Sequence, residues 1–184
     1  MAEPPKGPEA PVVPDPVMEA LLKDAYGSFD AEFSYAVDEL SVTVSRERIE
    51  EACRLAKEDP RLRFDYLRCL AVVEYPEHFQ AVYLLSSTSL EHKAVLKANA
   101  PKDDPAIPSV TGVWAGADWH EREGAELFGV TFTGHQDPRF LLLFDEFEGK
   151  YPMRKDYPYE EIEEWSPEND RPWQRAETES PDGG

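Results

Sequence analysis

Residues 63–98, RFDYLRCLAVVEYPEHFQAVYLLSSTSLEHKAVLKA, indicate the fold class of this chain. Apolar and polar residues alternate along two segments, 63–74 and 79–86, and turn-forming residues 76–78 separate them. A period of two residues is typical of a strand with one buried face, so the two segments predict an antiparallel hairpin. Segment 90–98 alternates more weakly and predicts a further antiparallel strand.

The preceding part of the chain predicts a second hairpin and two helices. Residues 33–37 and 40–44 alternate like strands around a short turn, and residues 17–26 have apolar side chains at helical spacing. A second helix is expected between Ser45, a favourable N-cap, and Pro60. Its buried face is expected to consist of Ile49, Ala52, Cys53 and Ala56. Together these elements predict an α+β fold, with a mostly antiparallel sheet packed with helices on one face.

The following part of the chain predicts one more helix. Residues 100–108 contain three prolines and two acids and are expected to form a loop. Asp118 is a good N-cap, and Glu121 is spaced to complete a capping box with it. Gly129 is expected to end this helix, and residues 130–132 to form a short strand.

The composition divides the chain into four segments. Residues 1–16 contain six prolines and are expected to be a flexible tail, followed by the α+β domain at 17–133. Residues 134–158 contain frequent turn formers and few apolar residues, so we expect an extended partner-binding arm that becomes ordered on binding. Residues 159–184 are rich in acids and are expected to be largely disordered.

The charge limits the classes of partner. The 184 residues have a formal net charge of −19 at pH 7, which repels nucleic-acid phosphates and anionic lipid. A halophilic source would give the same acidity. No signal peptide is expected, because residues 1–16 are Pro-rich and lack an apolar core, and no apolar run approaches the roughly 20 residues that a membrane helix requires.

The sequence predicts no metal site. Cys53 and Cys69 form no CxxC motif and are too few for an iron–sulfur cluster, so two unpaired thiols in a reducing compartment are expected. His120 and Glu121 begin like the zinc motif HExxH, but Gly124 occupies the position of the second histidine.

Residues 120–158 alternate clusters of charge with compact apolar blocks. The charged clusters are 121–123, 134–139 and 154–158, and the apolar block 140–144 lies between the last two. Such a surface suits contact with another protein, because apolar groups supply burial energy and paired charges fix the register. Within this stretch, Arg122 and Glu126 have the i, i+4 spacing of a helical ion pair.

The spaced motifs in this region resemble the signature of the 30-kDa subunit (C-type) family of respiratory complex I, NADH–quinone oxidoreductase. The resemblance covers roughly residues 60–158. Its central motif consists of Glu121, Arg122, Glu123, Glu126, Leu127, Phe128, His135, Arg139, Leu141 and Leu142. Its later motif includes Arg154, Lys155, Asp156, Tyr157 and Pro158.

The resemblance implies a non-catalytic structural and assembly role in the peripheral arm of a proton-pumping complex. All the motif residues just named are then expected at an interface with the quinone-site subunit of the 49-kDa (D) type, beside neighbouring peripheral-arm subunits. The chain itself is expected to hold no cofactor or metal, while FMN, iron–sulfur clusters and quinone belong to other subunits. Its expected location is the cytoplasmic face of the cell membrane, without a transmembrane segment of its own.

Three alternatives remain open at this point. Related subunits occur in membrane-bound hydrogenases and in complexes that oxidise coenzyme F420 or ferredoxin. A small metal-dependent hydrolase would use His120, Glu121 and His135, provided that these residues converge in one pocket. A third alternative is an acidic interaction domain unrelated to respiration.

Overall fold

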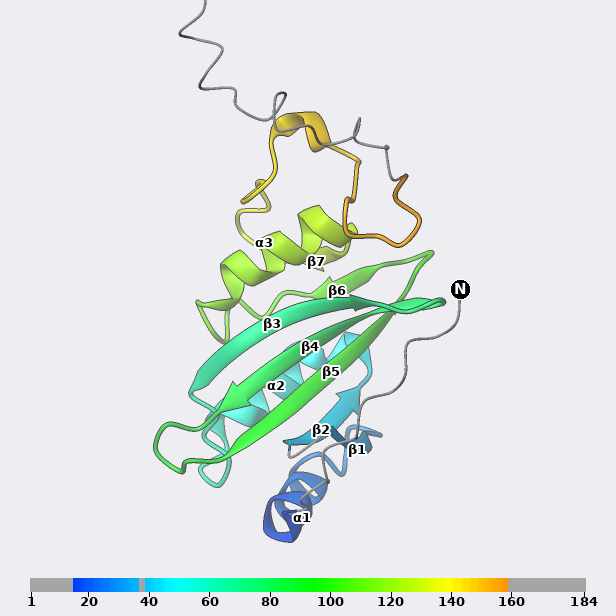
Figure 1. Cartoon of the computed structure of the whole chain (residues 1–184). Coiled ribbons are helices and arrows are strands. Elements are labelled where there is room, and N and C mark those ends of the chain that lie inside the picture. Colours follow the sequence, from blue (N-terminus) through cyan, green and yellow to red (C-terminus); the bar gives the residue numbers. More distant parts are fainter. Residues whose placement is uncertain (1–14, 37–38, 159–184) are drawn as a thin grey trace, which may run out of the picture.

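The computed structural model describes residues 15–36 and 39–158, so the predicted tails at 1–16 and 159–184 lie outside it except for Asp15 and Pro16 (Figure 1). The helices and strands follow one another in the order α1 (Pro16–Ala25), β1 (Glu32–Ala36), β2 (Glu39–Val44), η1 (Arg46–Arg48), α2 (Ile49–Glu58), β3 (Tyr66–Glu74), β4 (His78–Ser86), β5 (Lys93–Pro101), β6 (Ala106–Pro108), α3 (Ala117–Phe128), β7 (Thr131–Thr133) and η2 (Asp145–Phe147).

Five strands form the main sheet, in the order β1-β2-β5-β4-β3. Both predicted hairpins, β1–β2 and β3–β4, are present, and β4 pairs with β5 in antiparallel register as well. The pair β2–β5 is parallel, which makes the sheet mixed while leaving it mostly antiparallel as predicted. Because β2 and β5 are far apart in the chain, no local turn signal in the sequence marks their pairing.

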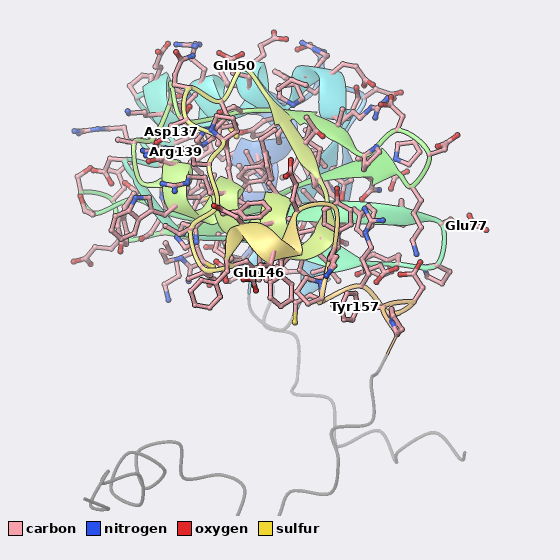
Figure 2. All side chains as sticks on the ribbon, turned by 90° about the horizontal axis from the view of Figure 1, so that it is seen from above. Glu50, Glu77, Asp137, Arg139, Glu146 and Tyr157 are labelled. Carbon is pink, nitrogen blue, oxygen red and sulfur yellow. The ribbon has the colours of Figure 1, made fainter. Side chains whose placement is uncertain are left out.

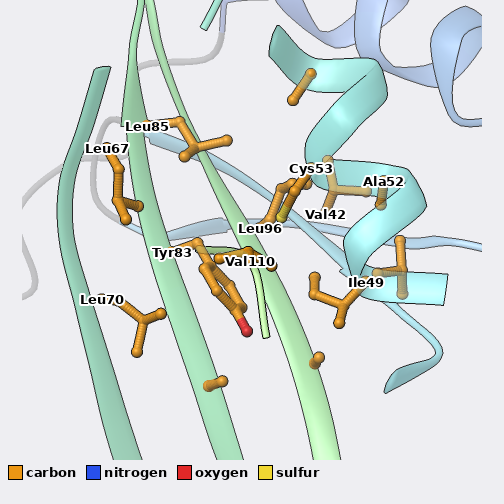
Figure 3. Packing of buried hydrophobic residues seen from close by; sticks show 14 of the residues in the cluster. Val42, Ile49, Ala52, Cys53, Leu67, Leu70, Tyr83, Leu85, Leu96 and Val110 are labelled. Carbon is orange, nitrogen blue, oxygen red and sulfur yellow. The ribbon is translucent and has the colours of Figure 1, made fainter. Parts of the chain in front are cut away.

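Helix α2 covers one face of this sheet (Figures 1 and 3). The four residues predicted for its buried face are all inaccessible to solvent, and burial alternates along β4 as the period of two requires. Helix α1 packs in the same layer, where the hydroxyl of Tyr26 donates a hydrogen bond of 3.0 Å to the carbonyl of Ala52. The fold is therefore the predicted α+β class, with its core between the sheet and these helices.

Helix α3 packs against β3 through a glycine. A Cβ atom at Gly124 would lie 2.6 Å from Cγ2 of Val72, so the two elements approach more closely than any larger residue permits. Gly129 ends the helix with a φ of 73°, as predicted. The predicted capping box is wrong: Gly116 is the N-cap, and Glu121 is fully buried instead of facing the helix terminus.

A short parallel pair, β6 and β7, extends the core beside α3. The strand at 106–108 lies in the predicted loop, because three residues that follow Pro105 and end at Pro108 give no periodic signal. Ile107 of β6 pairs with Phe132 of β7, and both side chains are buried. This pair places the loop 109–116 against the start of α3.

The contact at Gly124 gives a test of this packing. Gly124→Ala is expected to lower the free energy of unfolding by about 1–3 kcal/mol, because the new methyl group overpacks the contact with Val72. Gly112→Ala is the matched control, since a methyl group there meets nothing within 4 Å. Denaturant unfolding measures both variants, and equal stability for the two would contradict the packing described here.

Candidate functional site

The candidate site consists of α3 and the C-terminal arm, residues 134–158, which lies over that helix (Figure 2). The arm contains turns and the single 3₁₀ turn η2, and no long regular element. Figure 2 shows Asp137 and Arg139 side by side at one flank of the arm, and Glu146 at η2. Asp137 accepts two hydrogen bonds of 2.6 Å from Arg139, which lower the pKa of its carboxyl group to about 2.

The carboxylate of Glu126 holds the first half of the arm. It accepts hydrogen bonds from the backbone amides of three consecutive residues, with distances of 2.9 Å to Leu141 and Leu142 and 3.2 Å to Leu143. Only 2% of Glu126 is exposed. One buried acid therefore satisfies the backbone donors of a segment that has no strand or helix partner.

Arg122 holds the other side of the same segment. Its guanidinium donates to the carbonyl of Arg139 at 2.7 Å and to that of Phe140 at 2.8 Å. The predicted i, i+4 ion pair between Arg122 and Glu126 is therefore absent, because each side chain bonds to the arm backbone instead. This is a correction to the sequence-based prediction, and it assigns both residues an internal role.

The second half of the arm is attached to the end of α3 and to β3. Arg154 donates to the carbonyl of Phe128 at 2.6 Å, and its guanidinium lies 4.2 Å from the centre of the Tyr151 ring. The amide of Lys155 donates to the carboxylate of Glu74 at 2.7 Å. Lys102 also binds Glu74, and these two donors, Lys102 first, lower the pKa of the buried carboxyl group.

Glu121 and His135 lie between α3 and the start of the arm. One carboxylate oxygen of Glu121 accepts from the amide of Val110 at 2.7 Å, while the other has no hydrogen-bond partner among the residues that the structure describes. Burial raises the pKa of Glu121. Nδ1 of His135 accepts from the amide of Asp137, so its Nε2 carries the proton and donates to the backbone carbonyl of Asp118 at 3.2 Å. Nε2 also lies 2.9 Å from a carboxylate oxygen of Asp118.

The predicted interface residues fall into three groups by exposure. Glu121 and Glu126 are buried, and their carboxylates bind the chain itself. The partly buried group consists of Arg122, Glu123, Leu127, Phe128, His135, Leu141, Arg154 and Tyr157. The exposed group consists of Arg139, Leu142, Lys155, Asp156 and Pro158. A partner that docks on this conformation meets the second and third groups.

Exposed apolar side chains mark the same region. Leu142 is 60% exposed and Phe144 is 77% exposed on the arm, and Met153 and Trp119 are exposed nearby. Phe144 belongs to the apolar block 140–144 that the sequence suggested for such a contact, whereas Trp119 and Met153 were not among the predicted interface residues, although large apolar groups beside a charged motif are a usable signal. Trp119 and Leu142 line one groove, and a cavity of about 260 Å³ lies between α3 and the arm.

The three residues of the alternative hydrolase do not line one pocket: Glu121 and His135 line the cavity between α3 and the arm, and His120 lines the neighbouring groove. In residues 15–36 and 39–158, no group of three or more histidine, cysteine, aspartate or glutamate side chains is placed to hold a metal. Nε2 of His135 lies 4.0 Å from Glu121, but Glu121 is sealed from solvent, while His120 lines the groove with Trp119. The described part of the chain also contains no helix that is both long and apolar enough to cross a membrane.

The fold and site define a small α+β protein whose last helix holds an anchored C-terminal arm. Residues 42–163 match the family described as the respiratory-chain NADH dehydrogenase 30 Kd subunit, and the chain belongs to this family. It is 41% identical over 145 residues to the C-type subunit of NADH-quinone oxidoreductase from Roseiflexus sp. strain RS-1, covering 77% of this chain and 80% of that protein. It is 44% identical over 108 residues to the same subunit from Chloroherpeton thalassium, covering 58% of this chain but 45% of that longer protein.

Two solved structures share the fold. A trypsin-resistant fragment of Nqo5 superimposes with a TM-score of 0.56 at 27% identity, covering 65% of this chain and 98% of the fragment. A chain of the membrane-bound sulfane sulfur reductase, an archaeal respiratory membrane complex, superimposes with a TM-score of 0.67 at 25% identity. The superposition covers 78% of this chain and 86% of the reductase chain.

The role of Glu126 predicts a local loosening in Glu126→Gln. The variant places an amide N–H₂ group against backbone donors, so hydrogen exchange at residues 141–143 is expected to accelerate, with a loss of about 2 kcal/mol in unfolding free energy. Glu123→Gln is the control, because Glu123 is on the same helix and makes no hydrogen bond or ion pair among the described residues. Equal exchange in both variants would rule out the proposed anchor.

Glu121 predicts a specific pH dependence. Its folded-state pKa is raised by burial, so the unfolded chain loses this proton first, and stability falls as pH rises from about 4.5 toward the raised value. The free energy of unfolding of the native chain, minus that of Glu121→Gln, is therefore expected to decrease between pH 4.5 and 7. Denaturant titrations across this range measure it, and a difference that increases with pH would contradict the assignment.

Proposed function

We propose that this chain is a non-catalytic structural and assembly component in the peripheral part of a proton-pumping NADH–quinone oxidoreductase. Family membership supports the class of complex. The observation that carries the structural role is the anchored C-terminal arm, which presents apolar and charged side chains to solvent while its backbone bonds are satisfied internally. A surface of this kind suits a permanent contact with another protein of the complex.

The proposed partner is the quinone-site subunit of the 49-kDa type. Its contact would be centred on Leu142 and Phe144, with Trp119 at one side. Arg139, Lys155 and Asp156 are exposed around this centre and would fix the orientation, as charges at the rim of an interface do. In this proposal FMN, iron–sulfur clusters and quinone are held by other subunits, and those subunits keep the chain at the cytoplasmic face of the cell membrane.

A second candidate keeps the family and changes the complex. The structural similarity to the membrane-bound sulfane sulfur reductase favours an equivalent role in a related respiratory complex, such as a hydrogenase or an F420- or ferredoxin-oxidising complex. Affinity purification of the full chain from its native membranes in mild detergent separates these candidates. A quinone-site protein of the 49-kDa type, recovered with flavin and iron–sulfur proteins, supports the first, whereas a nickel–iron hydrogenase or sulfur reductase component supports the second. Recovery of the chain alone would contradict both.

The proposed contact predicts the effect of charge on the arm. Leu142→Arg and Phe144→Arg are each expected to weaken binding of the 49-kDa-type partner about 30-fold, which corresponds to about 2 kcal/mol for an interface hot spot. Val17→Arg on α1 is a matched control, since Val17 and Phe144 are both 77% exposed. Titration of the purified partner measures the affinities, and equal affinity for the arm variants and the control would place the contact elsewhere.

A further inference from the structure

Among the described residues, no helix covers the face of the main sheet opposite α2; it is called the open face below. Residues paired across β3, β4 and β5 point to this side in rows, including Ala71 beside Val82 and Val73 beside Gln80. The row at Leu84 adds Cys69 on β3, which like Leu84 is partly buried, and Val95 on β5, which is only 5% exposed. Tyr66, Val73 and Tyr75, at or next to β3, are among the exposed large apolar residues of the described chain. In Figure 1, α2 lies behind the sheet and no labelled helix crosses its front.

This face carries almost no acid, although the chain contains 38 acids among 184 residues. The three strands β3, β4 and β5 are nine residues long each, and their single acid, Glu74, is buried on the other face. Helix α2 shows the contrast, since its solvent side carries Glu50, Glu51 and Glu58 within ten residues.

The charges that do lie on the open face are positive or neutralised. Arg68 of β3 forms an ion pair with Glu39 of β2 and thereby spans the two strands between them. Lys93 and Lys97 are on the same face, and the described residues place no carboxylate within ion-pair distance of either. In a chain of net charge −19, an apolar surface edged by unpaired lysines is complementary to a partner that carries carboxylates.

We propose that the open face of β3, β4 and β5 is a second protein-docking surface, whose partner presents apolar side chains bordered by carboxylates. The C-terminal arm is attached on the opposite side of the sheet, through Glu74 and α3, so the two partners approach from different directions. A second copy of this chain fits poorly, because its lysines would meet lysines. Nucleic acid and anionic membranes are repelled by the net charge.

Photo-crosslinking in the assembled complex tests this surface. A benzophenone side chain at Val73 or Val82 of the full chain is expected to capture a neighbouring protein of the complex, at a peptide that contains carboxylates beside apolar residues. The double variant Lys93→Glu, Lys97→Glu is expected to reduce this capture at least about tenfold, because it reverses the charge at the rim of the interface. Lys23→Glu on α1 is the control for a charge reversal away from this face and is expected to leave capture unchanged, although it also breaks an ion pair with Glu19.

Several outcomes would overturn the proposal: no capture from Val73 and Val82, capture confined to the acidic tail of the same chain or to a second copy, or capture insensitive to the lysine reversals. A benzophenone at Leu142 reports separately on the proposed contact of the arm, so either surface can fail while the other holds. If the double reversal lowers the circular dichroism signal of the free chain, Lys97→Gln replaces it. Cys69 allows a second measurement on the native sequence, because it is partly accessible while Cys53 is fully buried. Labelling of Cys69 by maleimide is expected to be about tenfold slower in the complex than in the free chain.

Discussion

Buried carboxylates that accept hydrogen bonds from backbone amides hold the irregular parts of this protein in place. Glu121 binds the amide of Val110, Glu126 binds three amides of the arm, and Glu74 binds the amide of Lys155. A turn-rich segment has no strand or helix partner for its N–H groups, and a carboxylate can satisfy several of them at once. The arm can therefore pack without a core of its own, and its apolar side chains remain free to face outward.

This arrangement depends on close packing around α3. Gly124 brings the helix against Val72, and Gly129 leaves room for the guanidinium of Arg154, since a Cβ there would lie 2.4 Å from it. Because Glu121, Arg122 and Glu126 all project from α3, a shift of this one helix would disturb every bond that it makes to the loop at Val110 and to the arm. Part of the family motif, namely Glu121, Arg122 and Glu126, therefore holds the chain's own backbone in place.

The predictable part of the structure is the part encoded by local periodicity. The hairpin β3–β4 and the buried face of α2 follow from periods of two and 3.6 residues, and Gly129 follows from the stereochemistry of a helix end. The partners of Glu126 lie 15 to 17 residues away along the chain, so spacing alone suggested its neighbour Arg122 instead. The parallel pair β2–β5 escaped prediction for the same reason, because its strands are distant in sequence, whereas β6 is too short to give a periodic signal.

The surfaces of the molecule differ in the charges that they carry, which the total charge does not reveal. A net charge of −19 implies that a surface kept in water carries acids, as the solvent side of α2 does. The arm carries mixed charges around exposed Leu142 and Phe144, whereas the open face of β3 to β5 carries lysines and apolar groups. Strands disfavour Asp and Glu on either face, and docking of a partner that carries carboxylates, as proposed above, would add a second reason for their absence here.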